Sequence, residues 1–317
     1  MAEAAAVQVF DLETYLPGPS PSPYGEEIGP PGPDRLPPPP GYGFANYGTI
    51  FAARGNRGSG QQEPGDQHQA GDQQDGQVPS VAERAAQLVA LMDQAGVSEG
   101  AISTGSNAVT AEVIRLYPDR FRGIAHLSPY DGMRAVRELE RLVREEGFSG
   151  LSVASLYDQV RAGDARYYPL YAKAVELDVP VRVYTAMTYA NDRPYDLGHP
   201  RELDQIAMDF PELRLIAGLA GWPWINEMVG LLRRHPNLYC DTAAHRPRHL
   251  ATPGSGWEQF LQFGNTLLQD KIMVGLSWAL LGMSMTDLIA EYQALPLKET
   301  VQRKWLYSNA KRFFDRE

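Results

Sequence analysis

Apolar and polar positions follow a regular alternation from residue 79 to the C-terminus. Short apolar runs typical of buried strands are separated by longer stretches in which apolar residues recur every three or four positions, as in amphipathic helices. With an opening strand near residue 9, the predicted strands are 99–104, 121–126, 150–154, 179–184, 213–219, 238–241 and 271–276. Eight strands alternating with helices predict a parallel (β/α)8 barrel, a single domain over residues 1–317. An open doubly wound sheet is the alternative, but no glycine-rich phosphate motif follows the first strand.

The helix ends carry recognisable signals. Ser80 and Glu83 have the spacing of a capping box, and the apolar stripe after them stops at Gly96. A second amphipathic helix, 133–146, is stopped by Gly147. The other predicted helices are 108–117, 168–177, 200–209, 224–234 and 257–268.

Residues 18–78 break this alternation. The first half is rich in proline, and the second half consists mainly of Gly, Gln, Asp and Glu. Neither half has enough apolar side chains to offset the entropy of ordering it. We therefore expect an insertion after the first strand that is either disordered or a lid, in which the aromatic segment 42–51 docks on the barrel.

Charge narrows the function classes. The 317 residues include 29 Lys and Arg against 39 Asp and Glu, a net charge of −10, which disfavours nucleic acid and anionic membrane surfaces as partners. No apolar run approaches the roughly 20 residues that span a bilayer. Cys240 is the only cysteine, so an internal disulfide and a cysteine-based zinc site are excluded. A cytoplasmic location is the expectation.

The opening stretch 9–17 resembles the Asp-x-His-x-His-x-x-Pro signature of amidohydrolase-related enzymes, with Asp11 and Pro17 in place. This is the branch that includes aminocarboxymuconate-semialdehyde decarboxylase and resorcylate decarboxylase. Further segments resemble the family in order and spacing: 91–97, 117–121, 148–151, 168–171, 209–213 and 306–310. The resemblance implies an amidohydrolase-like barrel with a metal held by strands one, five and eight, and a histidine after strand six that is a ligand or the catalytic base.

The chemically active positions of that pattern are occupied by other residue types. The five positions read Glu13, Tyr15, Tyr184, Leu219 and Ser277. Catalytic zinc typically takes three protein ligands, and of these five side chains only Glu13 is a credible one. The expectation is therefore that the protein uses no metal and no other cofactor.

The mouth of the predicted barrel, at the carboxyl ends of the strands, is where catalysis is expected. The predicted catalytic residues are Glu13, Tyr15, His126, Tyr184, Asp241 and His245. The predicted substrate-binding residues are Leu219, Trp222, Trp224, Ser277 and Trp278. A carboxylate and two phenols can transfer protons and stabilise a developing oxyanion.

Three hypotheses for function follow. The preferred one is a metal-independent lyase or cyclase that decarboxylates, dehydrates or cyclises a small aromatic or polyketide-like acid. The second is a pseudoenzyme that binds a small molecule or a partner without turnover. The third is a metal-dependent hydrolase or decarboxylase with unusual ligands. A small molecule is the expected partner, and the resemblance suggests a homodimer.

Overall fold

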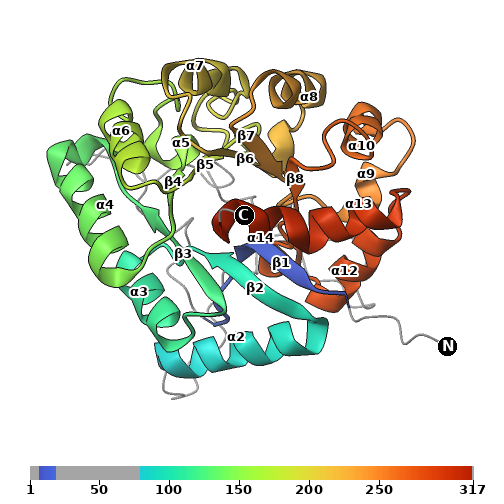
Figure 1. Ribbon diagram of the computed structural model, residues 1–317, viewed down its shortest axis with the longest axis horizontal. Coiled ribbons are helices and arrows are strands. Elements are labelled where there is room, and N and C mark those ends of the chain that lie inside the picture. Colours follow the sequence, from blue (N-terminus) through green and yellow to red (C-terminus); the bar gives the residue numbers. More distant parts are fainter. Residues whose placement is uncertain (1–6, 19–78, 316–317) are drawn as a thin grey trace.

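The computed structural model describes residues 7–18 and 79–315. Eight parallel strands, each paired with the next in sequence, surround the centre (Figure 1). The first and last strands also meet, because the Leu12 amide donates to the Val274 carbonyl at 2.9 Å. The predicted (β/α)8 barrel is confirmed. Its strands are β1 (Val9–Thr14), β2 (Val97–Ile102), β3 (Phe121–His126), β4 (Gly150–Val153), β5 (Val181–Tyr184), β6 (Leu215–Gly218), β7 (Leu238–Asp241) and β8 (Ile272–Met273).

Helices cover the outside of the ring (Figure 1). Between β1 and β7 they are α2 (Val81–Ala95), α3 (Asn107–Leu116), α4 (Met133–Glu146), α5 (Ser155–Asp158), α6 (Tyr168–Glu176), α7 (Arg201–Asp209) and α8 (Ile225–Arg234), with short turns η1 (Pro129–Asp131) and η2 (Leu219–Gly221). After β7 they are α9 (Pro247–Leu250), α10 (Glu258–Gly264), α11 (Trp278–Leu281), α12 (Met285–Gln293), α13 (Glu299–Arg303), η3 (Lys304–Ser308) and α14 (Asn309–Asp315).

The predicted ends of α2 are confirmed in detail. The Ser80 hydroxyl accepts from the Glu83 amide at 3.2 Å, and the Glu83 carboxylate accepts from the Ser80 amide at 2.8 Å. Gly96 ends the helix in the left-handed region, with φ of 76°. This turn leads directly into β2, which therefore begins two residues earlier than predicted.

The barrel interior is closed by apolar side chains at one end. Residues from strands on opposite sides of the ring contact one another there, which is possible only inside it. Phe10 stacks on Phe314 of the terminal helix at 5.4 Å, so α14 covers the end where β1 begins (Figure 1). The opposite end, where the strands finish, is left for the functional site. The interior cluster comprises Phe10, Leu12, Ala101, Ile124, Ile216, Met273, Ala310 and Phe313.

The last strand is shorter than predicted. Gly275 lies so close to Ala243 that a Cβ on it would come within 2.6 Å of the alanine methyl group. The next amide, that of Leu276, leaves the strand pattern and donates to Asp11 Oδ1 at 2.7 Å. Asp11 is fully buried and also accepts from the amide of Glu13 at 3.1 Å. Burial is the main cause that raises the pKa of Asp11 to about 6.

The predicted insertion, residues 18–78, lies outside the described residues except for Gly18, and so does its aromatic segment 42–51. Both remain predictions. Among the helices that the structure describes, none combines the length and the apolar character needed to cross a membrane.

Candidate active site at the barrel mouth

An arginine occupies the centre of the mouth. Arg182 of β5 donates to Glu13 Oε2 through Nη2 at 2.8 Å and to Asp241 Oδ2 through Nε at 2.6 Å. Its side chain is only 16% exposed, and the Glu13 side chain is 17% exposed. The cluster thus joins β1, β5 and β7. Sequence reasoning predicted Glu13 and Asp241 but missed the cation between them.

Gly218 at the end of β6 makes room for this guanidinium. A Cβ at Gly218 would lie 3.1 Å from both Cζ and Nη2 of Arg182. Burial opposes the charge of Arg182, but the carboxylates of Asp241 and Glu13 outweigh burial and raise the pKa of the guanidinium above its ordinary value. Arg182 is therefore a permanent cation.

Asp241 is the anchor of the cluster. It is fully buried, and its Oδ1 accepts from the amides of Leu219 at 3.0 Å and Ala243 at 3.1 Å in addition to Arg182. Because its oxygens are occupied by these donors, Asp241 orients Arg182 and the loop after β6. This geometry leaves it poorly suited to act as a proton-transfer group.

Glu13 has a different environment. The Tyr15 hydroxyl donates to Glu13 Oε1, while Arg182 holds the other oxygen. A phenol is therefore hydrogen-bonded to a carboxylate next to a fixed cation. This part of the predicted catalytic set is brought together as expected.

Tyr184 lies on the same face of β5 as Arg182, but its hydroxyl donates to the Met187 carbonyl at 2.7 Å. Its proton is committed to the backbone of the loop after β5. The expected role of Tyr184 as an oxyanion donor therefore has no geometric support in this conformation.

His245 lies beyond β7 and contacts the loop after β6. Its Nε2 donates to the Leu219 carbonyl at 3.2 Å, and its ring packs edge-on against Trp257 with centroids 4.9 Å apart. Burial lowers the pKa of His245 to about 4, so the ring is neutral at neutral pH. Its Nδ1 is then available as an acceptor.

His126 ends β3, and its backbone is fixed by two hydrogen bonds with the Asn107 amide at 2.8 and 3.0 Å. Asp158, which sequence reasoning missed, lies near enough for its charge to interact with His126. Burial, as the first cause, raises the pKa of Asp158, and the Tyr167 hydroxyl donates to its carboxylate at 2.6 Å. No hydrogen bond among the described residues links this pair to the Arg182 cluster.

The predicted substrate-binding residues comprise two buried loop residues and three tryptophans. Ser277 and Leu219 are buried in the loops, where Ser277 Oγ accepts from the Ala244 amide at 2.8 Å. Trp222 stacks on Tyr189 with centroids 6.2 Å apart. Trp224 packs on His199. The Trp278 indole N–H is buried and lacks a hydrogen-bond partner within the described part of the chain.

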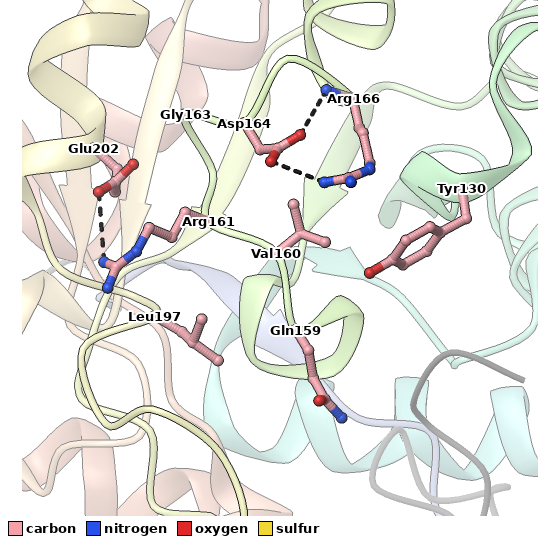
Figure 2. A pocket seen from close by; sticks show the side chains of 9 residues that line it. All are labelled: Tyr130, Gln159, Val160, Arg161, Gly163, Asp164, Arg166, Leu197 and Glu202. Atoms are coloured by element: carbon pink, nitrogen blue, oxygen red, sulfur yellow. Dashed lines mark hydrogen bonds and ion pairs between the residues drawn. The ribbon is translucent and has the colours of Figure 1, made fainter. Parts of the chain in front are cut away.

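A separate hollow of about 570 Å³ lies among the loops after β3, β4 and β5 (Figure 2). Figure 2 shows Arg161 reaching Glu202, 3.6 Å away, and Arg166 reaching Asp164 at 2.9 Å. None of the predicted site residues lines it. The barrel mouth, where the predicted residues Glu13, Tyr15 and Asp241 meet, is therefore the candidate site.

The chain is similar to known proteins in sequence and in fold. The amidohydrolase family model matches residues 36–316. Gamma-resorcylate decarboxylase from Polaromonas sp. is 37% identical over 101 residues, which are 30% of this chain and 31% of that protein. 2-keto-4-carboxy-3-hexenedioate hydratase from Sphingobium sp. is 35% identical over 88 residues, 25% and 26% of the two chains. The match thus spans less than a third of the length of each relative.

Solved structures share the fold. A TIM-barrel protein from Bordetella bronchiseptica has a TM-score of 0.62 and 24% identity, covering 76% of this chain and 86% of its own. 5-carboxyvanillate decarboxylase from Novosphingobium aromaticivorans has a TM-score of 0.56 and 17% identity, with coverages of 72% and 79%.

This decarboxylase contains manganese, which corrects the sequence-based expectation about cofactors. A solved decarboxylase of the same fold holds a metal, so the prediction of no cofactor is wrong. Within residues 7–18 and 79–315, no group of three or more His, Cys, Asp and Glu side chains could hold a metal. The two carboxylates at the centre flank Arg182, and the described residues therefore do not fit a centre of the usual kind.

Proposed function

Because the chain belongs to the amidohydrolase family, we propose that it is a lyase that moves a proton to or from carbon in a small aromatic or polyketide-like carboxylic acid. Decarboxylation is the favoured reaction, and hydration or dehydration is the second form of the same chemistry. The two relatives described above are a decarboxylase and a hydratase, which supports this class.

The observation that carries the proposal is the continuous line Tyr15–Glu13–Arg182–Asp241 at the mouth. It supplies a phenol proton donated to a carboxylate at one end and a fixed positive charge beside it. General acid–base catalysis requires a positioned proton donor whose partner can accept the proton back. The Tyr15–Glu13 pair meets this requirement, and no other predicted catalytic residue does so as directly.

In decarboxylation, the pair delivers a proton to the ring carbon that carries the carboxylate. The electron pair of the breaking carbon–carboxylate bond then returns to the ring, and CO2 leaves. The product is the aromatic compound with hydrogen in place of the carboxylate, and a proton from solvent reprotonates the pair. In hydration, the pair gives a proton to one alkene carbon, water adds to the other, and the proton lost by the water returns to the pair.

Substitutions at the pair test the proposal. We expect Glu13→Gln to lower kcat by roughly 100-fold to 10,000-fold, because an amide cannot exchange the proton. Tyr15→Phe should lower it less, since Glu13 remains. The assay is CO2 release and product formation from hydroxybenzoates such as 2,6-dihydroxybenzoate, with and without added manganese.

Glu145→Gln, on the exposed face of α4, is the matched control and should keep wild-type activity. Retention of wild-type kcat by Glu13→Gln would rule out the assigned proton donor. The pseudoenzyme alternative gains no support from the relatives, and it would require that no member of the panel be turned over.

A further inference from the structure

One edge of the Arg182 guanidinium makes no hydrogen bond to the described residues. Its Nε and Nη2 are bound by Asp241 and Glu13, whereas Nη1 has no hydrogen-bond partner among the residues the structure describes. Nη1 is not one of the buried side-chain atoms that lack a hydrogen-bond partner, so this edge of the guanidinium is accessible. A ligand acceptor can therefore approach it.

We propose that Arg182 is the residue that binds the substrate carboxylate, through the Nη1 edge of its guanidinium. This inference rests on the proposed function and adds the residue that makes the site selective for carboxylic acids. Arginine binds carboxylates in a planar, geometrically specific way, and the bond is strong where solvent is scarce.

The position of Arg182 supports this role. Asp241 fixes the guanidinium from β7 through Nε and Nη2, and Gly218 supports it from β6. The cation is therefore held in one orientation before the ligand arrives, which lowers the entropic cost of binding. The ligand carboxylate would lie beside Glu13, which binds Nη2 and belongs to the proposed proton-transfer pair.

A second unused donor lies at the same end of the barrel. Trp278 opens α11 immediately beyond β8, the strand next to β1, and its buried Nε1–H lacks an acceptor in the described part of the chain. A carboxylate has acceptor oxygens only. The accessible edge of Arg182 and the orphan donor of Trp278 therefore favour an anion over a neutral or cationic group.

The charges around Arg182 predict whether each substitution strengthens or weakens carboxylate binding. Glu13 and Asp241 are negative and compete with the ligand for the same cation. Removing the charge of Glu13 should strengthen carboxylate binding, whereas removing the planar fork of Arg182 should weaken it. If Arg182 had only a structural role, Glu13→Gln would not strengthen carboxylate binding while Arg182→Lys weakened it.

The experiment measures the dissociation constants of 2,6-dihydroxybenzoate and of its neutral amide by calorimetry, in the full-length chain. We expect Arg182→Lys to weaken binding of the acid by about tenfold or more and to leave the amide nearly unchanged. We expect Glu13→Gln to tighten binding of the acid by about threefold to tenfold. Arg137→Lys, on the exposed face of α4, is the matched control and should match the wild type.

Glu13→Gln is nearly isosteric, so it keeps the test valid if Arg182→Lys fails to fold. Weaker binding of the acid by Glu13→Gln, or equal losses of acid and amide in Arg182→Lys, would overturn the assignment. Because binding is measured without turnover, the assignment of Arg182 survives a failure of the proposed lyase activity. Conversely, turnover that persists unchanged in Arg182→Lys overturns the assignment alone.

Discussion

A single side chain, Arg182, defines the centre of the barrel mouth. The alternation in Val181, Arg182, Val183 and Tyr184 places Arg182 and Tyr184 on one face of β5 and the two valines on the other. A charge on the inward face of a buried strand is a signal that the sequence contains, because an unpaired charge there is costly. The sequence does not show which residue pairs with this charge, because Glu13 lies 169 residues away from Arg182.

Gly218→Ala tests how tightly Arg182 is held. The new methyl group would lie about 3.1 Å from the guanidinium carbon and would push it from its place. We expect a loss of about 1–3 kcal/mol in unfolding free energy and weaker binding of the carboxylate ligand. Urea titration and calorimetry measure the two effects. Unchanged stability and binding would mean that the guanidinium does not depend on Gly218.

At the scale of elements, the strand ends are joined by side chains rather than by the sheet alone. Asp11 links β1 to the segment after β8, and Asp241 links β7 to η2 and β5. Ser277 links the segments after β7 and β8 through the Ala244 amide. Strands and helices were predictable because their periodicity is local. These links were not, since each depends on contacts between residues that are distant in sequence.

The Asp11 link predicts a pH dependence. Its pKa is raised from 3.8 to about 6 in the folded state, so its contribution to stability is fully present below about pH 4 and is lost as pH rises through 6. Asp11→Asn keeps an acceptor for the Leu276 amide and removes the charge. The wild-type unfolding free energy minus that of the variant should fall by on the order of 2 kcal/mol between pH 4 and pH 7. Urea titrations at both pH values measure this difference, and a constant or rising value would contradict the account.

For the whole molecule, sequence periodicity was sufficient to predict a barrel, and the segments that resemble amidohydrolases were sufficient to predict the family. The cofactor prediction failed because it was drawn from five positions in this chain, whereas manganese is present in a solved decarboxylase of the same fold. The insertion and the predicted homodimer remain predictions. The barrel brings β1, β5 and β7 together, so residues far apart in the sequence form one site.

The central claim is that the mouth of this barrel transfers a proton to the carbon of a carboxylic acid through Glu13. The most direct measurement is proton NMR of 2,6-dihydroxybenzoate incubated with the enzyme in D2O. The account predicts deuterium at the carbon that carried the carboxylate, formed at least roughly 100-fold more slowly by Glu13→Gln than by the wild type and the Glu145→Gln control. Equal rates of incorporation in the wild type and Glu13→Gln, or none with the wild type, would contradict it.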